Sequence, residues 1–378
     1  MKHLIRFPSF YFALPILISC MMVFMTFDLP GSYLTGVFFL SSIALVAIGI
    51  DVVLKIRLPE MRAFQMIDFS GSREALVALA FCYFIMVFCL VDVTFFPIPL
   101  FGDPTMYATF EGGREHVRHI SDMSWILPPI ALLCIRNKIL RNFFIVVGFV
   151  FPILVLDRNR LFAALFSFML IFIFRRKSII RFPWKSVVFL SLAGASGFSA
   201  LGILRSGNLG YIFLPFSKLY ADAPVSIKWL LLYISAGVYN FSAILAKGYQ
   251  NSEFLMSQLL PFHNTVTVAT TDVPLDAETI NVGTEFFPFL MAFGPLGALL
   301  SALFLYLLFL WSVSFLRRKI SIFATLIFLR LAYVCVMSPF APQAFTWTNL
   351  GFLFICVFLQ IFSSLLPLRK KQVDGSYA

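Results

Sequence analysis

Arg158 and Arg160 lie in a polar Asp-Arg-Asn-Arg turn between the apolar stretches 143–156 and 161–174. As a helix rising 1.5 Å per residue, each stretch would span about 21 Å, less than the roughly 30 Å hydrocarbon core of a bilayer. We therefore expect the turn below the membrane surface, where a charge needs a partner or a cavity. Either an arginine pairs with Asp157 and snorkels, or the two guanidiniums form an anion site.

Two further arginines stand where a helix ends at, or crosses, the membrane. Arg205 closes the apolar stretch 187–204 at the level expected for the turn, and Arg330 lies inside the stretch 320–338. Guanidinium groups donate paired hydrogen bonds to phosphate oxygens, so Arg158, Arg160 and Arg205 at the same depth in the membrane suit a pyrophosphate. No Asp-rich metal motif accompanies them in the sequence, and we therefore expect arginine, with no metal or other cofactor, to neutralise a phosphorylated leaving group.

Candidate acid–base groups follow in the long polar segment 205–285. His263 and Glu285 could each act as a general base, and Tyr211 could contact substrate. An incidental loop histidine, and a glutamate that only partners an arginine, are the alternatives. Another candidate pair, His116 and His119, has the i, i+3 spacing of a helical metal site, but without a clear third ligand a solvated face is favoured.

The composition identifies the solvent of most of this chain as lipid. Its 378 residues are 60% hydrophobic and 12% charged, with mean hydropathy +0.93, whereas a soluble domain needs roughly 25% charged residues. The net charge of +11 comes from short basic clusters between apolar stretches, which argues against a nucleic-acid groove. The six cysteines lie inside apolar stretches, which predicts neither disulfides nor a zinc site.

The pattern predicts an all-α polytopic integral membrane protein of about ten transmembrane helices, in one domain over 1–378. The expected spans are 10–27, 32–53, 75–96, 121–135, 143–156, 161–174, 187–204, 286–311, 320–338 and 348–366. The positive-inside rule places both termini and the basic clusters in the cytoplasm. These clusters are Lys2/Arg6, Lys55/Arg57/Arg62/Arg73, Arg136/Lys138/Arg141, Arg175/Arg176/Lys177/Arg181/Lys185, Arg317/Arg318/Lys319 and Arg369/Lys370/Lys371.

One apolar segment, 228–247, is about long enough to be an additional span. If it crossed, everything after it would change side, and the basic residues would divide almost evenly between the two faces. We therefore expect an interfacial or re-entrant helix inside a large external loop, 205–285, before the eighth span.

With these features, the sequence resembles the Wzy-type O-antigen (oligosaccharide repeat-unit) polymerases. The likeness covers roughly 143–300: the arginine turn opening an apolar helix, Arg205 closing the next, the large loop, and Asn281…Thr284 before Phe-Gly-Pro-Leu-Gly at 293–297. Asn281…Thr284 and the segment 293–297 resemble the family's Asn-x-x-Thr and Asp-Phe-Gly-x-x-Gly pattern. Ala292 stands where the family often has an aspartate.

The resemblance implies a membrane glycosyltransferase of the bacterial inner membrane that polymerises undecaprenyl-pyrophosphate-linked repeat units into O-antigen or capsule-type polysaccharide at the external face. Arg158, Arg160 and Arg205 would hold the donor pyrophosphate, Arg330 would also bind substrate, and Glu285 or His263 would activate the acceptor hydroxyl. The lipid-linked oligosaccharides and membrane lipid are then the partners, with a chain-length regulator protein as a further candidate. An O-antigen ligase with a lipid A core acceptor and a lipid-linked oligosaccharide transporter or flippase are the alternatives.

Overall fold

The computed structural model describes residues 4–67, 69–103, 113–175, 184–206, 212–260, 273–277, 280 and 282–366. Its longer helices are α1 (Pro8–Thr26), α2 (Leu34–Leu54), α4 (Arg73–Phe95), α7 (Lys138–Leu154), α8 (Arg158–Arg175), α9 (Trp184–Ser206), α11 (Val225–Lys247), α13 (Phe287–Arg318), α14 (Ile322–Met337) and α15 (Trp347–Leu365). Shorter ones are α3 (Met61–Met66), α5 (Arg114–Ser121), α6 (Leu127–Cys134), α10 (Lys218–Ala221), α12 (Glu253–Leu259), and the 3₁₀ turns η1 (Leu4–Arg6), η2 (Gly31–Tyr33) and η5 (Asp122–Ile126).

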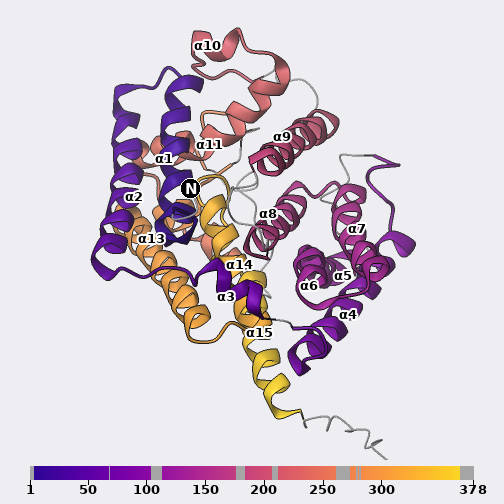
Figure 1. Cartoon of the computed structure of the whole chain (residues 1–378). Helices are drawn as coiled ribbons and strands as arrows, with labels where there is room; N and C mark the ends of the chain where they lie inside the picture. The colour runs from indigo at the N-terminus through magenta and orange to yellow at the C-terminus, as the bar shows by residue number, and fades with distance from the viewer. Residues whose placement is uncertain are drawn as a thin grey trace, which may run out of the picture.

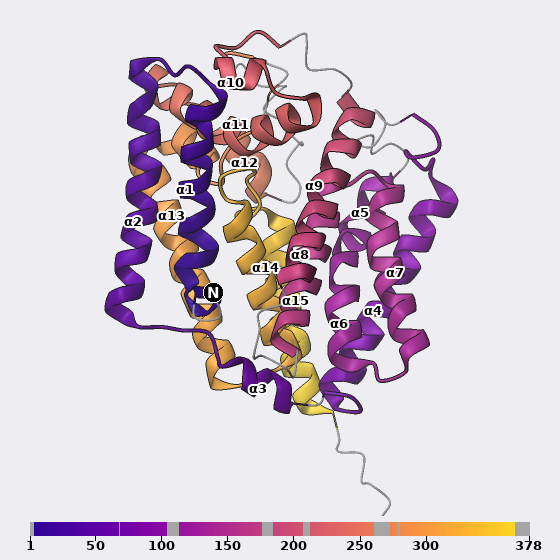
Figure 2. The same cartoon turned by 45° about the horizontal axis from the view of Figure 1, so that its top comes forward.

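The helices form a bundle around α14. Figures 1 and 2 show α1, α2 and α13 on one side, α4 to α7 on the other, and α8, α14 and α15 between them. Nearly every residue of α14 is buried, whereas large apolar side chains of the outer helices, such as Phe38, Leu90 and Phe354, are exposed. An apolar outer face of this kind requires lipid rather than water around it.

Six of the described helical segments are long and apolar enough to cross a membrane: Pro8–Thr26, Gly31–Leu54, Arg73–Phe95, Val225–Lys247, Phe287–Arg318 and Trp347–Leu365. Ile322–Met337 is a shorter apolar helix. The chain is thus a helical, multi-pass membrane protein, as its composition indicates. The expected number of ten crossings and the cytoplasmic location of the termini stay predictions.

Several of the basic clusters meet at one end of the bundle, which we call the basic end. Arg73 donates a hydrogen bond to the carbonyl of Ser364 (3.3 Å), so α4 begins where α15 ends. Lys319, just after α13, lies 3.6 Å from Glu74 on α4. Arg175 closes α8 against the carboxyl end of α6. Arg73, Lys319 and Arg175, which belong to three of the predicted clusters, therefore lie at the same end of the described bundle.

Both ends of α11 lie at the opposite end of the bundle, although this helix is long enough to cross a membrane. Near its start, the carbonyl of Ser226 accepts a hydrogen bond from Ser199 in the second half of α9 (3.2 Å). At its end, Lys247 lies 2.6 Å from Asp276, which also accepts a hydrogen bond from Tyr33 just before α2 (2.8 Å). The interfacial or re-entrant placement expected for 228–247 stays a prediction.

Two expectations about local structure need correction. The stretch 121–135 is not one regular helix but is divided between η5 and α6, and α5 precedes them. In α13, Gly294 adopts φ +66° and ψ −162° directly before Pro295, which interrupts the helix. The expected span 286–311 is therefore interrupted at Gly294, where glycine permits a bend because a side chain is strained at positive φ.

Candidate functional site

A polar cavity of about 240 Å³ lies at the amino-terminal end of α8, bordered by η5, α14 and the segment that leads into α15. Its polar lining residues include Asp122, Asn159, Arg160, Arg330 and Gln343. The cavity thus brings together two of the four arginines that the sequence singles out, from helices far apart in the chain.

Arg160 is held by two carboxylates. Its guanidinium forms ion pairs with Asp122 and, at 3.2 Å, with Asp157, and the residue is only 4% exposed. Asp157 also accepts the backbone N–H of Arg160 (3.0 Å), which caps the start of α8 and explains the Asp-x-x-Arg spacing. Pairing with Asp157, one of the two alternatives for this turn, is therefore what the structure shows for Arg160.

Arg158 lies on another face of α8 and does not line this cavity. Its guanidinium is 5.9 Å from the ring centroid of Tyr233 on α11. A Cβ at Gly202 of α9 would come within 3.2 Å of its Nη1 atom and 3.5 Å of the Trp229 ring. The arginine turn therefore supplies two separate places, and the expectation that Arg158 and Arg160 act on one anion is not supported by their directions.

An apolar groove of about 320 Å³ lies between α8, α9, α11 and α14, and one of its lining residues, Tyr233, is the aromatic neighbour of Arg158. Phe162, Phe166, Tyr233 and Tyr333 are among its lining residues. The hydroxyl of Tyr333 donates a hydrogen bond to Asn159, whose carbonyl is 2.8 Å away and whose side chain lines the polar cavity. The apolar groove and the polar cavity are therefore neighbours, separated by α8 and Tyr333.

Arg330 faces the protein interior, as expected for an arginine within an apolar helix. It lines the polar cavity, and its Nε donates to the side-chain oxygen of Asn349 (2.7 Å). The rings of Trp125 and Tyr333 lie about 6.0 Å from the guanidinium carbon. An intramembrane arginine with an amide acceptor and two aromatic neighbours is held in place without a direct carboxylate contact among the described residues.

Glu285 lies behind the polar cavity and is 1% exposed. One of its carboxylate oxygens accepts the backbone N–H groups of Gln343 (2.6 Å) and Ala344 (2.9 Å). Burial raises the pKa of Glu285 to about 8, against the opposing effect of these donors and of Arg330. The carboxylate therefore positions the segment that lines the cavity.

The remaining predicted residues have no described side chains. Tyr211 and His263 lie outside the described residues, and for Arg205 only the backbone is described. Arg205 follows Gly202 by three positions on α9, so the two Cα atoms lie on the same helix face. At Gly202, the missing side chain leaves room for the guanidinium of Arg158.

Sequence reasoning missed a buried ionic cluster beside the cavity. Asp92, fully buried on α4, accepts from Nε of Arg114 (3.0 Å) and lies 3.5 Å from Nε of Arg118. Both arginines are 5% exposed or less, whereas His116 on the same helix is exposed, so α5 has one solvated face and one buried, charged face. The available signal was Asp92 itself, because a carboxylate inside an apolar stretch needs a buried partner.

His116 and His119 both lie on α5. Their rings are 6.3 Å apart, and His119 packs against Trp347 at 4.5 Å. Among the described residues, no group of three or more His, Cys, Asp or Glu side chains could hold a metal ion.

Comparisons with protein-family models, with curated proteins and with solved structures found no match to this chain. Any function must therefore be argued from the site.

Proposed function

We propose that this protein is a membrane glycosyltransferase that polymerises oligosaccharide repeat units carried on a polyprenyl pyrophosphate, the activity of the O-antigen polymerases. The observation that carries the proposal is Arg158 beside the ring of Tyr233, which lines the apolar groove, next to a polar cavity on the far side of α8. An amphiphile with an isoprenoid chain and a charged, sugar-bearing head needs these three features side by side.

The groove would take the isoprenoid chain of the donor, because its walls are aromatic and aliphatic side chains. Arg158, with Arg205 one turn beyond Gly202, would hold the pyrophosphate at the groove rim. Arg330 and the amides Asn159 and Gln343 would bind sugar hydroxyls in the polar cavity. The arginines would be on the outer leaflet side, because the positive-inside rule puts the basic end in the cytoplasm.

In the reaction, an acceptor hydroxyl oxygen bonds to the anomeric carbon of the donor as the bond from that carbon to the pyrophosphate oxygen breaks. The pyrophosphate leaves with the bonding electrons, and the guanidinium charge stabilises it. A base takes the hydroxyl proton. The candidates for this base are Glu285, whose carboxylate lies buried behind the segment that lines the polar cavity, and His263.

The pairing of Arg160 changes its proposed role. Two carboxylates already neutralise its guanidinium, so Arg160 would shape the polar cavity instead of binding the leaving group. The pyrophosphate site then depends on Arg158 and Arg205.

The test is the length of surface polysaccharide in a host that lacks this protein, with and without complementation. A polymerase predicts lipid A core capped with a single unit, and long chains after complementation. We expect Arg158→Gln to reduce chain extension about 10²- to 10³-fold, the effect of removing one donor that stabilises a developing oxyanion. Arg318→Gln, the same change on an exposed residue at the basic end, should leave chain length normal.

Two other results would reject the polymerase. Loss of all capping, with long chains still on the lipid carrier, would identify a ligase. Unchanged polysaccharide in the deletion host would favour a transporter of lipid-linked sugars. Normal chain length with Arg158→Gln in a confirmed polymerase would remove this arginine from the site.

A further inference from the structure

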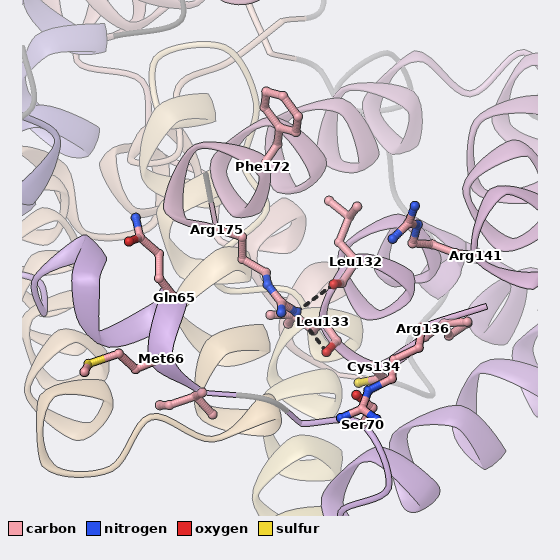
Figure 3. A pocket seen from close by; sticks show the side chains of 12 residues that line it. Gln65, Met66, Ser70, Leu132, Leu133, Cys134, Arg136, Arg141, Phe172 and Arg175 are labelled. Atoms are coloured by element: carbon pink, nitrogen blue, oxygen red, sulfur yellow. Dashed lines mark hydrogen bonds between the residues drawn. The ribbon is translucent and has the colours of Figure 1, made fainter. Parts of the chain in front are cut away.

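A second cavity, of about 720 Å³, lies at the basic end between α3, the α6–α7 connection and the last turn of α8 (Figure 3). Arg136, Arg141 and Arg175 line it, with the polar side chains of Gln65 and Ser70. Among its described lining residues there is no carboxylate. Two of these arginines, Arg141 and Arg175, therefore bring positive charge to the cavity from two different helices, α7 and α8.

Arg175 is fixed in position inside this cavity. Its Nη1 donates to the carbonyls of Leu132 (2.7 Å) and Leu133 (3.0 Å), at the carboxyl end of α6. Figure 3 shows the guanidinium between α8 and these carbonyls, with Arg141 across the cavity. Carbonyl oxygens hold a guanidinium without cancelling its charge, so Arg175 stays available for an anion through its other N–H groups.

The same cavity has apolar walls. Met66 and Ile67 contribute from α3 and its end, and Phe172 contributes from α8. Met66 is 76% exposed, on a short helix that Figure 2 shows lying across the base of the bundle. Phe64 of the same helix is buried and stacks on Phe174 at 4.8 Å, which anchors α3 to α8. Charge and apolar surface thus meet in one cavity at the basic end of the bundle.

We propose that this cavity binds the phosphate headgroup of an anionic phospholipid of the cytoplasmic leaflet. Arg141 and Arg175 contact the phosphate oxygens, and Met66 and Phe172 contact the first methylenes of the acyl chains. A soluble phosphate compound would satisfy the arginines but not the exposed apolar wall, which is why the lipid is favoured. Basic pockets on the cytoplasmic side of membrane proteins recognise such headgroups. This site is separate from the proposed catalytic site, and its test does not depend on catalysis.

The experiment measures binding of phosphatidylglycerol and cardiolipin to the purified full-length protein in a neutral detergent, by native mass spectrometry and by thermal stabilisation. Arg141→Gln should weaken binding roughly tenfold, the effect of one lost charge-assisted hydrogen bond. Arg318→Gln, an equal charge change at the same end but outside the cavity, should leave binding unchanged. Arg141 is the better target because Arg175 also ties α8 to α6, and its loss could unfold the protein.

Three results would overturn the proposal. Equal weakening by Arg318→Gln would show that lipid binds only to the overall charge of the basic end. Equal stabilisation by phosphatidylcholine would exclude recognition of an anion. Full competition by inorganic phosphate or pyrophosphate at millimolar concentration would show that the ligand is a soluble phosphate compound and not a lipid. Monodisperse gel filtration of each variant verifies that a loss of binding is not a loss of fold.

Discussion

The two arginine-lined cavities lie towards opposite ends of α8 and balance their charge differently. In the polar cavity, Arg160 is clamped between Asp122 and Asp157. In the cavity at the basic end, Arg175 is held by carbonyl oxygens, and the described lining residues include no carboxylate. An arginine that already has its counter-ions shapes a site, whereas one held only by dipoles can still attract a ligand anion.

Arg158 and Arg160 show the same contrast within one turn of helix. Residues two apart on a helix differ in direction by about 200°. Arg160 therefore reaches the aspartates of the polar cavity, while Arg158 points to Tyr233 and the notch left by Gly202. Identical side chains at neighbouring positions thus receive different roles from what surrounds them.

The largest effect should come from removing a carboxylate that neutralises buried arginines. Asp92→Asn leaves Arg114 and Arg118 without their shared counter-ion, which should destabilise the protein by about 3–5 kcal/mol. The shift of the thermal unfolding curve in detergent measures this, with the exposed Asp222→Asn as the matched control. If both variants unfold alike, the cluster does not carry the stability that its burial implies.

A smaller effect separates pairing from ligand binding at Arg160. Arg160→Gln should destabilise the fold, and adding Asp122→Asn should restore part of the loss, with a coupling of about 1 kcal/mol because Asp122 is half exposed. A double-mutant cycle of thermal stabilities gives this coupling. Unchanged stability together with lost polymerisation would mean that Arg160 contacts substrate after all.

The smallest effect concerns an ion pair in water. Burial raises the pKa of Asp276, but hydrogen bonds from Lys247, Tyr33 and Tyr239 outweigh it and hold the pKa below the usual range. The lowered pKa stabilises the fold at pH values above about 4, and this contribution is lost as the pH falls through the folded-state pKa. Asp276→Asn should reduce the pH dependence of the melting temperature between pH 5 and 3. The contribution to the free energy of unfolding that it removes should be less than about 1 kcal/mol. A slope equal to that of the unsubstituted protein would assign the acid sensitivity to another group.

Much of the fold was predictable because hydropathy reports the solvent. Apolar runs such as 10–27 and 348–366 became α1 and α15, because a segment in lipid must satisfy its backbone hydrogen bonds internally. The stretch 121–135 was harder to interpret. It is divided between η5 and α6. In α5, which precedes it, Arg114 and Arg118 are buried against Asp92 of α4, and such a contact between distant helices is not encoded in the local sequence pattern.

The sequence by itself determined the membrane environment, the gathering of basic residues at one end, and the presence of unusual arginines near helix ends, because these depend on residue type and order. Only the tertiary structure decided which arginine meets a carboxylate, which meets an aromatic groove and which lines the cavity at the basic end. Those outcomes depend on side chains from distant helices, such as Asp122 beside Arg160 and Leu133 beside Arg175. Packing places these partners, and the partners determine whether a charge supports the fold or remains available to bind.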